Sequence, residues 1–94
     1  MSADNGIFIL ELVNGKNKIY KVKEDTESCL GNWYEDYKYS QNPETKAEAL
    51  KMVLEIYKDC EIFQDVNMAR EKAFEIEAKL DICEYGVMQI SVEI

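Results

Sequence analysis

The chain contains no histidine, and this absence excludes several kinds of chemistry. A Ser-His-Asp triad, a Cys-His pair, a histidine-bearing metal site and an imidazole switch near neutral pH all require that side chain. None of the four glycines lies in a GxxxxGK[ST] sequence, so no phosphate-binding P-loop is expected. The three cysteines form no CxxC pair, and nothing around them indicates a lowered thiol pKa. We therefore expect a protein that is not an enzyme, with no metal site and no cofactor.

Long apolar runs are also lacking. The opening segment, MSADNGIFIL, has no positive charge, and its apolar stretch is too short for a signal sequence or a membrane span. Three cysteines, an odd number without paired spacing, are typical of reduced thiols. These features predict a cytosolic protein that does not contact a membrane.

The composition is that of one small, acidic, folded domain covering residues 1–94. Apolar residues make up 47% of the chain, which is enough for a hydrophobic core. The formal net charge is -8, and such a charge repels nucleic-acid backbones. A protein partner with a basic surface is the expectation that follows.

A β-hairpin is predicted at the N-terminal end. Residues 7–13 are apolar and rich in β-forming side chains, Asn14-Gly15 is a turn signal, and residues 19–23 alternate apolar side chains with lysine. Two turns are compatible with this pattern. We favour an odd-numbered loop with a bulge at Gly15, because it separates apolar from charged side chains better than a two-residue turn does.

Residues 24–42 show no sustained helical period and are predicted to form a short strand near residues 29–34 and then a loop. The segment is rich in aromatic and acidic side chains, which are typical of a contact surface. The partner-binding residues predicted here are Trp33, Tyr34, Glu35, Asp36, Tyr37 and Tyr39.

Two helices and a final strand complete the predicted fold. Asn42-Pro43 suits a helix start, and a capping box of Thr45 and Glu48 is an alternative start of the same helix. Apolar residues then recur at three- and four-residue steps to about residue 59. Asp65 is placed to cap a second helix over residues 66–80, and Glu75 is spaced to pair with Lys79. Residues 87–94 alternate apolar and polar side chains, as a half-buried strand does.

This order predicts an α+β fold, with an antiparallel sheet of three or four strands and two helices packed on one face. We expect the C-terminal strand to lie centrally beside the hairpin. An uncovered apolar face bearing Ile7, Ile9 and Ile19 would be buried by formation of a homodimer or higher homo-oligomer.

One cluster of basic side chains lies on the hairpin. Lysines at alternate positions of an edge strand commonly prevent edge-to-edge pairing, and here they are also a candidate site for a small anionic ligand such as a nucleotide. The residues of this candidate anion site are Lys16, Lys18, Lys21 and Lys23.

Two short segments, residues 2–10 (SADNGIFIL) and residues 83–87 (CEYGV), are informative together. They are similar to the SADNGIYIL opening and the EYGI motif of a family of small uncharacterised proteins encoded by bacteriophages and prophages. Both motifs have the composition of turns that flank strands. If the first and last strands pair, a polar cluster of Asp4, Asn5, Glu84 and Tyr85 forms at one end of the sheet.

The resemblance to phage proteins implies an accessory factor that acts on the host. We expect a non-enzymatic inhibitor of a host defence component, such as an anti-CRISPR protein, that places its acidic and aromatic surface on a basic groove. The alternative hypothesis is an oligomeric sponge that sequesters an anionic nucleotide signal with the hairpin lysines.

Overall fold

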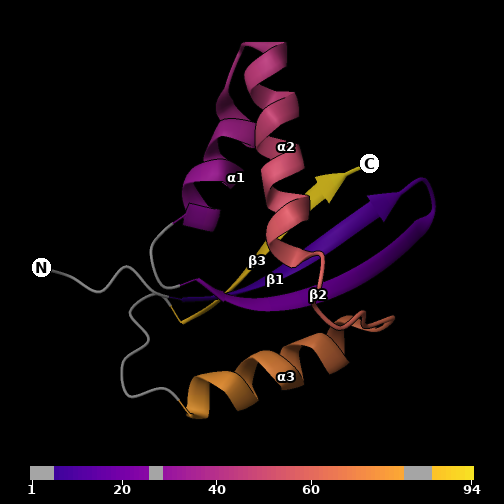
Figure 1. Ribbon diagram of the computed structural model, residues 1–94. Helices are drawn as coiled ribbons and strands as arrows, with labels where there is room; N and C mark the ends of the chain where they lie inside the picture. The colour runs from indigo at the N-terminus through magenta and orange to yellow at the C-terminus, as the bar shows by residue number, and fades with distance from the viewer. Residues whose placement is uncertain (1–5, 26–28, 80–85) are drawn as a thin grey trace, which may run out of the picture.

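A computed structural model describes residues 6–25, 29–79 and 86–94, and the fold is α+β as predicted (Figure 1). The elements are β1 (Gly6–Asn14), β2 (Asn17–Asp25), α1 (Cys29–Tyr39), α2 (Pro43–Tyr57), α3 (Val66–Ala78) and β3 (Val87–Glu93). The described part of the chain therefore holds three helices, one more than the sequence pattern predicts.

The sheet has the strand order β2-β1-β3, with β1 in the centre. β2 is antiparallel to β1, whereas β3 is parallel to β1. The prediction of a wholly antiparallel sheet with the C-terminal strand in its centre is therefore wrong. Alternation of apolar and polar residues identifies a strand and its buried side, but it carries no information about the direction of that strand or its neighbours.

The hairpin between β1 and β2 closes with a two-residue turn, because Asn14 is the register partner of Asn17. Gly15 has a φ of 62°, the left-handed conformation that both common two-residue hairpin turns require at their first central position. The predicted odd-numbered loop is wrong. Separation of apolar from charged side chains favours the odd-numbered loop, but in the structure both faces of the sheet bury apolar side chains beneath helices, so this separation does not decide the register.

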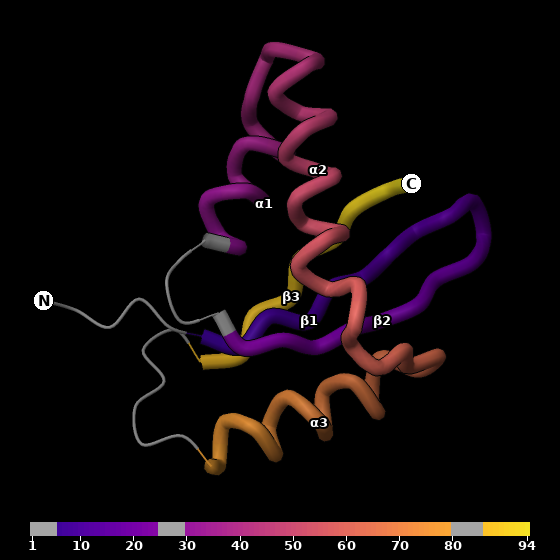
Figure 2. Tube along the Cα trace, in the orientation of Figure 1, coloured from indigo at the N-terminus to yellow at the C-terminus, as the bar shows by residue number. Residues whose placement is uncertain are grey.

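Helices lie on both faces of the sheet, as Figures 1 and 2 show from the same side. α1 and α2 cover the face that carries Phe8, Leu10 and Leu12, together with Ile90 and Val92 of β3. α3 covers the opposite face, where Ala69 and Ala73 pack against a group of buried sheet residues. That group is Ile7, Ile9, Tyr20 and Val22.

This arrangement corrects two expectations. The helices are not confined to one face, and Ile7 and Ile9 do not form an uncovered surface, since they are 0% and 1% exposed beneath α3. Ile19 packs against the core on the α1 and α2 side. β1 is therefore buried on both faces, which explains why residues 7–10 are a continuous apolar run.

The short strand and loop predicted for residues 29–42 are wrong, because residues 29–39 form α1. Leu30, Trp33, Tyr34 and Tyr37 follow the i, i+3, i+4, i+7 spacing of a helix, and all four contact the core beneath α1 and α2. The period is present in the sequence but is obscured by aromatic side chains, which favour strands, and by Gly31, which disfavours helices.

The starts of α2 and α3 confirm the predicted caps. The side chain of Asn42 accepts hydrogen bonds from the backbone N–H groups of Glu44 and Thr45, and Pro43 is the first helical residue. The Asp65 carboxylate accepts a hydrogen bond of 2.8 Å from the N–H of Asn67. In both cases a short polar side chain satisfies an N–H group that the first helical turn leaves without a partner.

A membrane-spanning helix is not found in residues 6–25, 29–79 and 86–94, since each helix there is too short or too polar to cross a bilayer.

Candidate functional site

α1 divides the predicted partner-binding residues between an inner and an outer face. Trp33, Tyr34 and Tyr37 point toward the core and are half-buried there, beside the fully buried Leu30. The rings of Tyr34 and Tyr37 stack with their centroids 6.2 Å apart and their planes at 28°. These three aromatic side chains therefore anchor α1 to the domain.

The hydroxyl group of Tyr37 also joins α1 to the sheet. It accepts a hydrogen bond of 3.2 Å from the backbone N–H of Glu93 in β3. A tyrosine on the inner face of α1 thus satisfies a backbone donor at the end of a strand, which fixes the orientation of the helix on the sheet.

The remaining side chains form a surface that we call the α1 outer face. It consists of Asn32, Glu35, Asp36 and Tyr39, all of them exposed. At 100° per residue these positions lie within about a third of the helix circumference, opposite the aromatic anchors. Tyr39 is 70% exposed, and the ammonium group of Lys38 lies 5.4 Å from the centroid of its ring. The sequence-predicted residues that reach solvent together are therefore two carboxylates and one aromatic ring.

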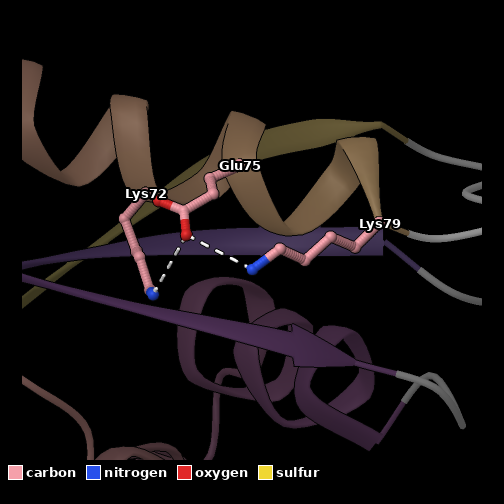
Figure 3. A network of polar contacts seen from close by, with 3 residues as sticks. All are labelled: Lys72, Glu75 and Lys79. Atoms are coloured by element: carbon pink, nitrogen blue, oxygen red, sulfur yellow. Dashed lines mark hydrogen bonds and ion pairs between the residues drawn. The ribbon is translucent and has the colours of Figure 1, made fainter.

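One carboxylate on each of the other two helices has a lysine partner, Glu55 on α2 and Glu75 on α3. On α2, Glu55 and Lys58 are 2.7 Å apart, and this hydrogen bond lowers the pKa of the Glu55 carboxyl group and raises the pKa of the Lys58 ammonium group. On α3, Figure 3 shows Glu75 between Lys72 and Lys79, at 3.9 Å and 3.4 Å, which confirms the predicted Glu75–Lys79 pair. These exposed ion pairs contribute little to stability, but they compensate the charges of Glu55 and Glu75.

Glu35 and Asp36 of the α1 outer face differ from Glu55 and Glu75 in this respect. Other exposed carboxylates, such as Glu71, also have no ion pair in the described residues, but the α1 outer face places two of them beside the exposed ring of Tyr39. Within residues 6–25, 29–79 and 86–94, neither Glu35 nor Asp36 has a lysine or arginine within ion-pair distance. Both carboxylates therefore face solvent without an ion-pair partner in the described residues, beside the exposed ring of Tyr39.

The hairpin lysines do not point to one common surface. The register places Lys18 on the α3 side of β2, Lys21 and Lys23 on the α1 and α2 side, and Lys16 in the turn. The ammonium group of Lys21 donates a hydrogen bond of 3.1 Å to the carbonyl oxygen of Tyr57, at the C-terminal end of α2. The same carbonyl accepts a hydrogen bond of 3.0 Å from the N–H of Cys60. A cation at the C-terminal end of a helix interacts favourably with its last carbonyl groups, so Lys21 has a structural role.

A polar cluster that the sequence pattern does not reveal lies on the α3 side of the sheet. The carboxylate of Glu11 accepts a hydrogen bond of 3.2 Å from the hydroxyl of Tyr20 and one of 3.0 Å from the hydroxyl of Ser91. Glu11 is the register partner of both residues, so one carboxylate links all three strands. Only the correct register could reveal this cluster, because the favoured odd-numbered loop shifts Tyr20 to the opposite face from Glu11.

Tyr20 makes the stability of the domain depend on pH in the alkaline range. Burial raises the pKa of its hydroxyl above the ordinary 10.0, and the hydrogen bond to Glu11 and the negative charges of Glu11 and Asp65 raise it further. The folded state therefore holds this proton more tightly than the unfolded state does. The stabilisation is complete below about pH 10 and is lost as the pH rises through the folded-state pKa.

We expect Tyr20→Phe to lower the free energy of unfolding by about 1 kcal/mol at pH 8, because one hydrogen bond is lost. The difference between wild type and variant should shrink above about pH 10, where the wild type loses the contribution of its tyrosine. Urea denaturation at a series of pH values measures both quantities. A difference that stays constant up to pH 11 would contradict this assignment.

The polar cluster predicted from Asp4, Asn5, Glu84 and Tyr85 lies outside the described residues. Within residues 6–25, 29–79 and 86–94, no group of three or more cysteine, aspartate and glutamate side chains is arranged to hold a metal ion.

No protein-family model, curated protein or solved structure matches the chain.

Proposed function

We propose that the protein is a non-enzymatic binding protein that attaches the α1 outer face to a basic surface of a host defence component and thereby inhibits it. The observation that supports this proposal is the pair of unpaired carboxylates, Glu35 and Asp36, next to the exposed ring of Tyr39. The partner is expected to be a protein whose basic groove normally holds a nucleic acid.

The surface suits such a partner for three physical reasons. Carboxylates without an internal lysine partner leave their attraction available to an approaching cation, and this attraction speeds association and selects its orientation. An exposed tyrosine adds apolar contact area at a small cost in conformational entropy. Because Trp33, Tyr34 and Tyr37 hold α1 on the core, the outer face is already ordered before binding.

The test compares two charge-reversal variants as baits for proteins in a host lysate. The first variant, Glu35→Lys with Asp36→Lys, alters the α1 outer face. The matched control, Glu61→Lys with Glu71→Lys, alters exposed carboxylates elsewhere. Each reversal adds two charges, so both variants change the net charge from -8 to -4.

We expect a basic host protein to be captured by the wild type and by the control, and its recovery to fall at least about tenfold with the α1 variant. A tenfold change in affinity corresponds to about 1.4 kcal/mol. Equal losses with both variants would show that capture reflects net charge alone, and full recovery with the α1 variant would remove the α1 outer face from the interaction. Circular dichroism of all three proteins verifies that the fold is retained.

A further inference from the structure

β3 is an edge strand, with β1 on one side only. The carbonyl of Gly86 accepts a hydrogen bond from the N–H of Ile7, and the N–H of Ile94 donates one to Val13, both at 2.9 Å. The even-numbered residues of 86–94 therefore direct their backbone N–H and C=O groups toward β1. Because the direction alternates along a strand, Val87, Gln89 and Ser91 direct theirs away from the sheet.

This outer edge is open over part of its length. At Glu93 the N–H is satisfied by the hydroxyl of Tyr37. At Val87, Gln89 and Ser91, the described part of the chain supplies no hydrogen-bond partner for the outward backbone groups. Three residues with unpaired donors and acceptors form a template for a further strand.

The opposite edge of the sheet is protected. Tyr20 of β2 exchanges two backbone hydrogen bonds of 2.8 Å with Phe63, in the segment that joins α2 to α3. Lysines at residues 16, 18, 21 and 23 line the same strand and its turn, and lysine is a residue that discourages strand pairing. β3 has neither a paired segment at its outer edge in the described residues nor lysine side chains. It contains no proline and no charged residue before Glu93.

The charge pattern favours a second copy of this chain as the partner that pairs with the open edge of β3. Residues 85–92 are the longest stretch of the sequence without a charged side chain, in a chain of net charge -8. Two such molecules repel each other over most of their surfaces, and this segment is where they approach at the lowest electrostatic cost. A strongly charged partner would find no opposite charge there. Met88 is 44% exposed and adds apolar surface to the edge.

We propose that two copies of the protein pair through β3, antiparallel about a twofold axis at Gln89, to form one continuous sheet. In this register Gln89 faces the partner's Gln89, and Val87 faces the partner's Ser91. The three outward residues of each copy would together make about six backbone hydrogen bonds across the axis. Met88 of each copy would lie beside the partner's Ile90 on the α1 and α2 side.

The register follows from the contact between Glu93 and Tyr37. A shift that centred the pair on Ile90 would bring Glu93 into the new ladder and require its N–H to leave the Tyr37 hydroxyl. Centring on Gln89 uses the three free positions and keeps that bond. Because the β2 edge is closed, pairing through β3 ends at a dimer.

Sedimentation equilibrium of the wild type, from about 10 µM to about 1 mM, tests the proposal across the range of weak association. We expect a species of twice the 10.9 kDa chain mass. Gln89→Pro removes an outward N–H without touching the ladder to β1, so it should give a folded monomer. Gln89→Lys should do the same, because it places two ammonium groups opposite each other at the axis.

Gln89→Ala is the matched control, since it keeps every backbone group and should stay dimeric. A wild type that remains monomeric over the whole range would overturn the proposal. So would a dimer that persists in both Gln89→Pro and Gln89→Lys, because such a dimer uses another surface. The assay is independent of the proposed function, as neither Glu35 nor Asp36 lies on β3.

Discussion

Replacing Tyr57 with alanine is expected to lower the free energy of unfolding by about 3–5 kcal/mol, as large-to-small changes at buried aromatic residues do. Tyr57 is 0% exposed and is the largest of the fully buried side chains. Its ring joins the last turn of α2 to the core, and its hydroxyl donates a hydrogen bond of 3.0 Å to the carbonyl of Phe8 in β1. Alanine would leave a cavity at the junction of α2 and the central strand.

Tyr57→Phe separates the ring from its hydroxyl. It keeps the packing and removes one buried hydrogen bond, so a loss of about 1 kcal/mol is expected. Urea denaturation followed by circular dichroism measures both variants. If alanine costs no more than phenylalanine, the ring is not packed in the core as described.

The second large effect is expected at Ile9, on the side of the sheet that α3 covers. Ile9→Ala should cost about 2–5 kcal/mol, in the same range as Leu10→Ala on the opposite side. Ile9 is 1% exposed and Leu10 is 0% exposed, and they belong to two separate clusters of buried residues. Each loss is a large share of the about 5–15 kcal/mol that stabilises a domain.

The comparison of these neighbours tests whether the central strand is buried on both sides. The same denaturation experiment serves for both variants. A cost below about 1 kcal/mol for Ile9→Ala, beside a full cost for Leu10→Ala, would mean that α3 does not cover its face of the sheet.

Elements specified by local signals were predictable from the sequence. Asn42-Pro43 and Asp65 mark the starts of α2 and α3, because a cap acts on N–H groups only two or three residues away. The alternation of residues 87–94 identifies β3 for the same reason, since each side chain reports only its own side of the strand.

Features that depend on distant parts of the chain were not predictable in this way. The register of the hairpin depends on whether a helix covers the face of Ile7 and Ile9, and α3 lies far along the sequence. The parallel direction of β3 depends on the path of the whole chain between β2 and β3. In α1, Leu30, Trp33 and Tyr37 have helical spacing, but the intrinsic preference of aromatic residues for strands leads to the wrong prediction of a strand there.

The candidate site shows the same division. The sequence predicts a contact surface within residues 33–39. Only the structure shows that Trp33 and Tyr37 point inward, while Glu35, Asp36 and Tyr39 face solvent. The cluster around Glu11 left no local signal, because its members come from three strands.

The central position of β1 bears on how the domain is assembled during synthesis. β1 and β2 are neighbours in sequence and close their hairpin early, whereas β3 reaches β1 only after about 80 further residues, as the hydrogen bond between Ser91 and Glu11 illustrates. Until β3 leaves the ribosome, one side of the most apolar strand has no neighbour. Nascent chains therefore pass through a stage in which residues 7–10 are open to chaperones and to other unfinished copies.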